Sequence, residues 1–242
     1  MGRRSRAELI LHSLILPPDL SFILLWPYMA SFTLFFSSAV LLPLMTTQIF
    51  FTTSYTARWQ ALPPVPSPPR SGHATAADAE GNVFLFGGYA ETPGAPRDVV
   101  NDLLRYSPSS NSWSLLSPSI GRNNPNAPGP RLVSTCAHHG SEILLFGGWD
   151  PESAGSGGII FDDVWSYSPS TGAWEPRGAM PGGPASRHCA VNVGGTVIVH
   201  THKCVDHVLV WDSEAKVLRR QGTTGEAPSP RGLHAAAAAD NR

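Results

Sequence analysis

The chain has 242 residues, and 17 lysines and arginines against 18 aspartates and glutamates give it a formal net charge of −1. This balance gives no electrostatic reason to expect nucleic acid as a partner. Twenty-three glycines and 23 prolines, with only 14% charged residues, favour many short elements and turns over long helices. The three cysteines, Cys136, Cys189 and Cys204, are odd in number and widely spaced, which implies free thiols and no disulfide framework.

The first segment, residues 1–57, differs in composition from the rest. No acidic, basic or histidine residue occurs from Leu20 to Ala57. The stretch 20–45 is long enough to cross a bilayer, which takes about 20 apolar residues. Arginines at positions 3, 4 and 6 precede it, as in a signal-anchor with its basic end in the cytoplasm.

A second interpretation of this segment carries equal weight. Phe, Leu, Ser and Pro dominate it and have pyrimidine-rich codons, so residues 1–57 are also explained as a non-coding tract translated ahead of the true start. The protein is expected to be membrane-anchored if 20–45 is a real span, and cytoplasmic otherwise.

From residue 58 onward the chain repeats itself. Segments 69–117 and 130–178 share a glycine pair, a tyrosine and a tryptophan at intervals of 60 or 61 residues. These residues are Gly87, Gly88, Tyr106 and Trp113 in the first segment, and Gly147, Gly148, Tyr167 and Trp174 in the second. A third segment, 186–221, has Trp211 and Leu218 in the last two places.

Each segment predicts four short strands, which in the first lie near 74–80, 82–88, 102–107 and 112–116. A self-similar unit of about fifty residues with four strands predicts a propeller blade or a similar array. The glycine pair and the two aromatic residues at these spacings resemble the Kelch repeat, the blade unit of Kelch β-propellers and of galactose-oxidase-like domains.

The resemblance covers residues 58–242 and implies an all-β propeller with about three complete four-stranded blades. Partial blades are expected at both ends: a closing strand at 58–64 and the start of a further blade at 230–242. Since propellers close with about 4–8 blades, the chain is expected to be a C-terminally truncated member of the family.

An arginine leads each repeat, and in the Kelch family it is typically structural. The sequence places Arg70, Arg131, Arg187 and Arg231 in this role. The histidine three residues later is present as His73 and His234, and Ser134 and Ala190 are expected in its place in the second and third repeats.

The third repeat departs from the pattern at one spot. The sequence alignment puts His200 and Thr201 at the glycine pair, and His202 at the place of Tyr89 and Trp149. His207 takes the place of Asp102 and Asp163.

His200 and His202 lie two residues apart at a strand end and can share a face, and His207 begins the neighbouring strand. With Cys204 or Asp206 this arrangement allows a transition-metal site. The preferred interpretation is that these rings fill a degenerate blade and bind no metal, because no paired cysteines and no HExxH motif accompany them.

The long loops give the candidate partner-binding residues. In an up-and-down meander, loops 89–101, 117–130 and 149–162 emerge on one face, and long loops on a rigid scaffold often carry binding residues. Aromatic and arginine side chains dominate interface energetics. The candidates on this face are Tyr89, Arg97, Arg122, Trp149 and Asp150, with Arg97 and Trp149 as anchors. The alternative is that these Gly- and Pro-rich loops merely tolerate insertion.

No nucleophile elbow, P-loop or dinucleotide motif occurs in the chain, so the sequence predicts no catalytic residue and no cofactor. The predicted function is a non-catalytic protein-interaction scaffold with an unknown protein partner. The alternative is a metal-dependent or small-molecule-converting propeller that uses the cluster from His200 to His207. Whether the protein is an enzyme stays open here, although the residues favour that it is not.

Overall fold

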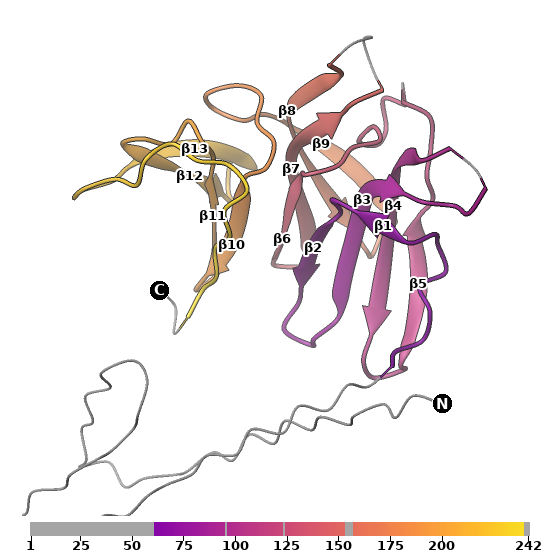
Figure 1. Cartoon of the computed structure of the whole chain (residues 1–242). Coiled ribbons are helices and arrows are strands. Elements are labelled where there is room, and N and C mark those ends of the chain that lie inside the picture. Colours follow the sequence, from indigo (N-terminus) through magenta and orange to yellow (C-terminus); the bar gives the residue numbers. More distant parts are fainter. Residues whose placement is uncertain (1–60, 95, 123, 153–156, 240–242) are drawn as a thin grey trace, which may run out of the picture. The chain divides into compact units, whose positions relative to one another are not determined.

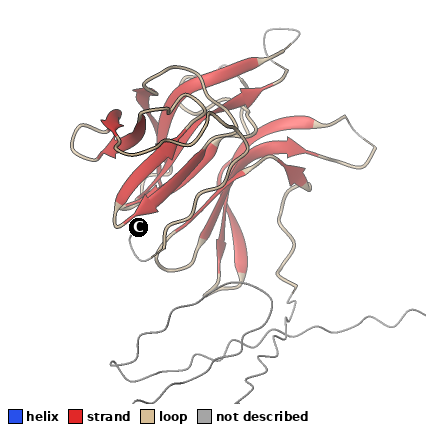
Figure 2. Cartoon of the chain, turned by 60° about the vertical axis from the view of Figure 1, so that its left-hand side comes forward, coloured by secondary structure: helices blue, strands red, loops and turns tan. Residues whose placement is uncertain are grey.

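The computed structural model describes residues 61–94, 96–122, 124–152 and 157–239. Strands and loops make up these ranges, with no helix long and apolar enough to cross a membrane among them (Figure 2). The stretch 20–45 and the expected domain boundary after residue 57 both lie outside the described residues. Apart from Ala61, the described residues belong to one unit, Leu62–Arg242.

Three antiparallel sheets form within this unit, one for each sequence repeat (Figure 1). The first blade contains β1 (Arg70–Ser71), β2 (Ala74–Ala77), β3 (Val83–Ala90), β4 (Asp98–Ser107) and β5 (Ser112–Ser117). The second contains β6 (Thr135–His139), β7 (Glu142–Asp150), β8 (Ile159–Ser168) and β9 (Ala173–Ala179). The third contains β10 (Cys189–Val193), β11 (Thr196–His200), β12 (His207–Asp212) and β13 (Val217–Gly222). This arrangement confirms the predicted all-β fold of four-stranded blades.

The segments expected to contribute partial blades are only partly described. Residues 61–64 of the predicted closing strand form no strand, although the carbonyl of Pro63 accepts a hydrogen bond of 3.2 Å from Trp113 Nε1. Residues 230–239 likewise form no strand, but the backbone N–H of Leu233 donates to the Arg187 carbonyl at 2.8 Å.

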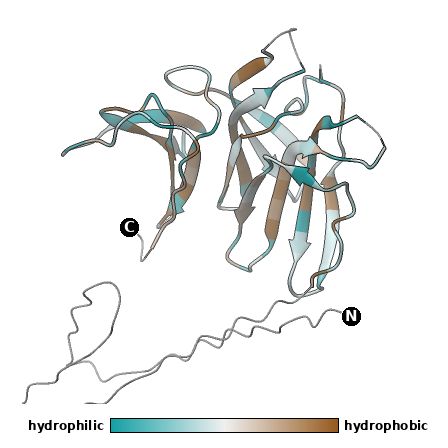
Figure 3. Ribbon diagram, viewed as in Figure 1, coloured by the Kyte–Doolittle hydropathy of each residue, from teal (hydrophilic) through white to brown (hydrophobic). Residues whose placement is uncertain are grey.

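Two hydrophobic cores lie between successive blades. One joins Phe86 and Leu103 of the first blade to Tyr167 and Trp174 of the second. The other joins blade two to the buried residues of blade three, including Trp211. Successive side chains of a strand point to opposite faces, so a blade packed on both sides needs apolar residues on both faces. Figure 3 shows hydrophobic residues on the strands of the blades.

The motif aromatics fill the space between the first two sheets. The Trp174 ring lies 5.4 Å from Phe86, edge-on, and 5.1 Å from Tyr167, measured between centroids. Their polar groups are satisfied across the junction, since Trp174 Nε1 donates to Ser117 Oγ at 3.2 Å and the Tyr167 hydroxyl to the Leu116 carbonyl at 2.9 Å. Aromatic side chains with a polar tip are suited to such a position.

The glycine pairs admit the backbone of the next blade. The ladder between β3 and β4 shifts register between Phe86 and Gly88, where a bulge forms. The N–H of Gly88 donates to the Arg131 carbonyl at 2.9 Å, and a Cβ placed on Gly87 would lie 2.7 Å from that oxygen. A side chain there would therefore push the second blade away, which explains why this position needs glycine.

The third repeat joins in a different register from the one predicted. Ala185 is the counterpart of Arg131: its carbonyl accepts from Gly148 N–H at 2.9 Å, and its N–H donates to the Phe161 carbonyl at 3.1 Å. The prediction that Arg187 leads this repeat is therefore wrong, because the arginine alone had fixed the alignment.

The true place of Arg187 follows from the backbone. Gly72, Val133, Arg187 and Leu233 share a positive φ of 49–66°. They are linked in series by hydrogen bonds from each N–H to the preceding carbonyl, of 2.7–2.9 Å. His188, and not Ala190, consequently occupies the place of His73 and Ser134 in the third repeat.

Candidate functional site

Two of the leading arginines are buried scaffold residues. Arg131 is fully buried, and its guanidinium donates to Asp163 at 2.5 and 2.9 Å and to the Gly147 carbonyl at 3.0 Å. Arg70 makes the same contacts with Asp102, at 2.6 and 2.9 Å, and with the Gly87 carbonyl, at 3.0 Å. A two-pronged contact of this kind is geometrically specific.

The third blade has lost the whole of this arrangement. Ala185 stands where the arginine would be, and His207 stands where the aspartate would be, as the sequence predicted for His207. His207 is buried, with Nδ1 at 2.6 Å from Asp206 Oδ1, and its Nε2 accepts from Arg220 Nε at 3.2 Å. Its side chain is thus held by its own blade.

The glycine-pair position in the third blade lies one residue later than predicted. His200 pairs with Cys189, just as Phe86 pairs with Ala74 and Phe146 with Thr135. His200 therefore takes the phenylalanine place. Thr201 and His202 take the glycine places, which puts Lys203 at the place of Tyr89 and Trp149.

The four residues of the alternative metal site, His200, His202, Cys204 and His207, do not converge on one point. His200 Nδ1 lies 3.0 Å from His234 Nε2, whereas His207 bonds to Asp206. Cys204 Sγ accepts from the backbone N–H of Thr201 at 3.4 Å, and His202 is exposed. Within the described part of the chain, no three His, Cys, Asp or Glu side chains form a group that could hold a metal ion.

The candidate partner-binding residues lie at the ends of strands and in the loops between them. The glycine bulges let β3 and β7 run on, so Tyr89 pairs with Val99, and Trp149 with Ile160, where the sequence had placed loops. Asp150 is also the last residue of a strand and not a loop residue. Only the shorter stretches between these strands remain as loops.

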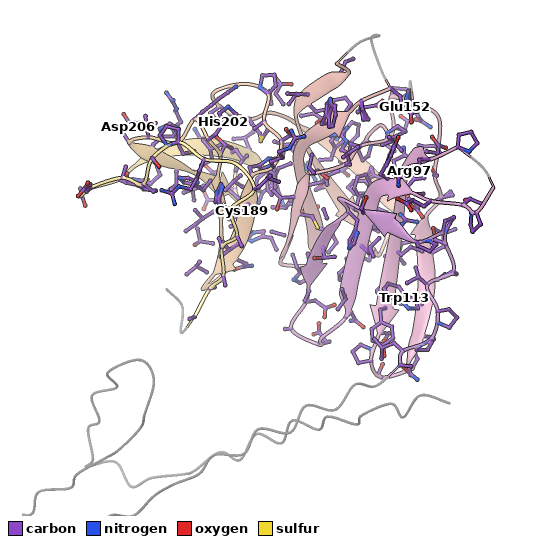
Figure 4. All side chains as sticks on the ribbon, viewed as in Figure 1. Arg97, Trp113, Glu152, Cys189, His202 and Asp206 are labelled. Carbon is purple, nitrogen blue, oxygen red and sulfur yellow. The ribbon has the colours of Figure 1, made fainter. Side chains whose placement is uncertain are left out.

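Arg97 is the most open of the candidates. Its guanidinium lies 2.9 Å from Glu91 and 5.8 Å from the Tyr89 ring centroid, and its side chain remains 60% exposed. Pro69, Thr92 and Pro93 line a shallow pocket together with Arg97 and Glu91. Figure 4 shows Arg97 at the opposite end of the first blade from Trp113.

Arg122 links two loops of this face. It reaches from the connection between β5 and β6 to Asp150 at 2.9 Å and Glu152 at 2.5 Å. The hydrogen bond to Asp150 raises the pKa of Arg122 above its ordinary value. The contact brings two of the predicted residues, Arg122 and Asp150, to one side of the blades, as expected for an up-and-down meander.

Trp149 lies against Arg187, which the sequence analysis had assigned a structural role. Its Nε1 donates to the Gly157 carbonyl at 2.9 Å, and the exposed guanidinium of Arg187 lies 5.2 Å from its ring centroid. Arg187 and Lys203 are therefore additional candidates on this face. The alignment of repeats on the arginine had hidden both, and the strand pairing of the third blade reveals them.

The successive four-stranded sheets, joined through bulged strands and sharing inter-blade cores, define a β-propeller. Residues 43–242 match the KLHDC2/KLHL20/DRC7 Kelch-repeats domain. The chain therefore belongs to the Kelch-repeat family.

Curated relatives resemble the chain over part of their length. It is 25% identical over 171 residues to the N-acetylneuraminate epimerase of Pasteurella multocida strain Pm70, covering 59% of this chain and 43% of that one. It is 27% identical over 130 residues to the F-box/kelch-repeat protein At1g15670 of Arabidopsis thaliana, covering 54% and 32%. The chain thus spans less than half the length of either relative.

A solved structure, that of YjhT, shares the fold. It superimposes with a TM-score of 0.52 and 21% sequence identity, over 72% of this chain and 57% of that one.

Proposed function

We propose that this Kelch domain is a non-catalytic protein-interaction domain, and that its partner contacts the face carrying Tyr89, Arg97, Arg122, Trp149 and Asp150. The observation that carries the proposal is a recurring pair. Tyr89 and Trp149 occupy equivalent places in successive blades, and each has an exposed arginine over its ring. Aromatic and arginine side chains are the ones on which protein interfaces most depend.

The fixed position of these rings also supports the proposal. Both stand on paired strands, so a partner would meet side chains whose backbone is already ordered. A preordered surface loses less conformational entropy on binding than a loop does.

The test is partner capture by the tagged full chain, followed by mass spectrometry. Trp149→Ala and Arg97→Ala should each weaken capture about tenfold, because interface anchors of these types cost more than 1 kcal/mol when truncated. Neither variant should lower the melting temperature by more than a few degrees, since both side chains are at least partly exposed.

Two variants away from this face serve as controls. Arg219→Ala removes an arginine that is 62% exposed and paired with Asp212, and Ser170→Ala alters the turn between β8 and β9. If these variants weaken capture and the face variants do not, the proposed face is wrong.

A second candidate function has one observation in its favour. Several curated relatives are named N-acetylneuraminate epimerases, at 25–28% identity. The alternative is therefore a small-molecule-converting propeller that uses residues of the segment from His200 to His207. Incubation of the full chain with N-acetylneuraminate, followed by NMR, together with metal analysis of the purified protein, separates this function from the first.

A further inference from the structure

A series of backbone hydrogen bonds runs from blade junction to blade junction and is open at its first member. The N–H groups of Val133, Arg187 and Leu233 each donate to the carbonyl of the preceding member, at 2.7–2.9 Å. The first member, Gly72, gives its carbonyl to Val133, but its own N–H has no hydrogen-bond partner within the described ranges. The first blade therefore presents a free donor where the later blades bind the blade before them.

The last member of the series, Leu233, is poorly suited to its place. Its φ is 57°, which glycine adopts freely and leucine does not, and its side chain is 77% exposed. Gly72 has a φ of 66°. A glycine in the Gly72 conformation would therefore bind the Arg187 carbonyl with the same backbone geometry and without the strain.

The segment around Leu233, residues 230–239, resembles the start of the first blade. It is identical to residues 69–78 at six of ten places. The corresponding segments of the second and third blades, 130–139 and 184–193, match 230–239 at three places each. The exposed side of the third blade thus holds a segment that mimics the start of the first blade in particular.

The face of the third blade that points away from the second blade is apolar. Val197 and Val199 point into the core shared with the second blade. Ile198 lies between them on β11 and pairs with Val210 on β12, so both point to the opposite face, as does Val208. All three remain partly exposed. Covering such a face removes apolar surface from water and is favourable.

The same face of the second blade is already covered. Leu144 is the counterpart of Ile198, and Val164 is the counterpart of Val208, by the strand pairing of the two blades. Both counterparts are fully buried in the core shared with the third blade. The equivalent cover for the third blade is therefore the face of another blade.

The first blade carries the matching side of such a junction. Tyr106 and Trp113 are the counterparts of Tyr167 and Trp174, which fill the junction between the first and second blades. Trp174 is buried, whereas Trp113 remains partly exposed. The first and third blades thus present the two complementary halves of one blade junction.

We propose that the first blade of a second copy of the chain covers the third blade, so that two copies close one ring of six blades. Three blades from each copy give a number within the range of about 4–8 that propellers use. Gly72 of the second copy takes the place of Leu233 on the Arg187 carbonyl, and residues 230–239 are displaced. Each copy offers its first blade to one junction and its third blade to the other, so the head-to-tail contact closes on itself.

Sedimentation velocity of the full chain is the first test. The chain should sediment as a dimer at about 10 µM, because the two blade junctions form together. Val208→Glu should raise the dissociation constant of the dimer at least about tenfold, since it buries a carboxylate at the junction. Ile160→Glu is the matched control and should leave the constant unchanged, because Ile160 is a 46% exposed strand residue of the second blade, which takes no part in the new junction.

A disulfide between the two copies tests the arrangement directly. Arg187 Cβ lies 3.6 Å from the Cβ position of Gly232, which is the counterpart of Ser71. Ser71 of the second copy should reach the same place, and this separation suits a disulfide. A mixture of Ser71→Cys and Arg187→Cys chains, both altered at exposed residues, should therefore form a covalent dimer on oxidation. Either variant alone should not, because the natural cysteines are buried.

Two results would overturn the six-blade ring. One is a chain that stays monomeric. The other is a dimer that tolerates Val208→Glu and gives no disulfide in the mixture, because the copies then associate through another surface. If near-UV circular dichroism shows that the Val208→Glu chain does not fold, the disulfide decides alone. Partner capture through Trp149 and Arg97 does not depend on this dimer, so the proposed function stands if the ring fails.

Discussion

At the scale of single residues, His188 shows how burial alone sets a charge state. Its side chain is buried, and that burial lowers its pKa from 6.5 to about 4. The carbonyls of Phe146 and Ser186 partly oppose the lowering, although neither ring nitrogen reaches a partner at hydrogen-bond geometry. Nearby His234 and His202 lower the pKa of His188 further, since like charges repel.

This lowered pKa predicts loss of stability in acid. Well above pH 6.5 His188 is neutral in both states and contributes no pH dependence. As the pH falls from 6.5 towards 4, the unfolded chain binds a proton that the folded chain does not, so the free energy of unfolding decreases. The loss should be about 2 kcal/mol at pH 5 and about 3 kcal/mol below pH 4.

Urea unfolding of the full chain at about pH 7.5 and about pH 5 measures this difference. Burial also lowers the pKa values of His73 and His200, so they add to the loss in the same direction. His188→Ser, which copies the residue found at Ser134, isolates the contribution of His188. If this variant loses as much stability in acid as the unaltered chain, His188 is not the cause.

At the scale of elements, the bulged strands decide how blades join. In β7 the register shifts between Phe146 and Gly148, and the strand then continues to Asp150. The bulge turns one backbone N–H outward, to the Ala185 carbonyl. One strand therefore belongs to its own sheet and also holds the start of the next blade, and this same bulge places Trp149 on the face proposed to bind a partner.

Gly147→Ala should disrupt this element. The new Cβ would lie 2.5 Å from the Ala185 carbonyl oxygen at a residue whose φ is 47°. The free energy of unfolding should fall by about 2–4 kcal/mol, combining overpacking with backbone strain. Thermal or urea unfolding measures the change.

Gly178→Ala separates the two causes. Gly178 also has a positive φ, of 87°, but nothing lies within 4 Å of its Cβ position. This control should cost about 1 kcal/mol, from strain alone. Equal costs at Gly147 and Gly178 would show that close approach of the third blade plays no part.

At the scale of the whole described unit, every junction between blades has the same backbone hydrogen-bond pattern, but the side chains at the junction differ between the first two blades and the third. Hydrogen bonds link Gly72 to Val133, Val133 to Arg187, and Arg187 to Leu233 in the same way each time. The first two blades add a buried arginine on an aspartate. The third has Ala185 and His207 instead, so both partners of the pair have changed together.

Removing one partner of the pair should therefore be worse than exchanging both. Arg131→Ala should lower the free energy of unfolding by about 3 kcal/mol, because Asp163 and the Gly147 carbonyl lose a buried donor. Adding Asp163→His, which copies the third blade, should recover part of that loss. Arg219→Ala, in an exposed pair, should cost less than about 1 kcal/mol. Additive effects of Arg131→Ala and Asp163→His in urea unfolding would contradict this coupling.

The sequence by itself determined the architecture and most of the motif. Glycine pairs, Tyr106, Trp113 and their counterparts recur at nearly constant spacing, because each blade must solve the same packing problem against the next. The antiparallel meander also follows from short turns alternating with longer connections, and it predicted that Arg122 and the end of β7 would lie on one side.

Only the tertiary structure decided the register of the third repeat and the roles of its residues. Alignment of the repeats on their leading arginines had placed Arg187 among the structural residues and His200 at the glycine pair. Register is instead fixed by backbone hydrogen bonds between segments far apart in the chain, such as Ala185 to Gly148, and these leave no local pattern in the sequence. When the alignment of the third repeat is shifted by two residues, the buried arginine position falls on Ala185 and Arg187 becomes an exposed residue. For that reason Arg187, found near Trp149, and Lys203 are assigned to the face proposed to bind a partner only when the blades are seen packed together.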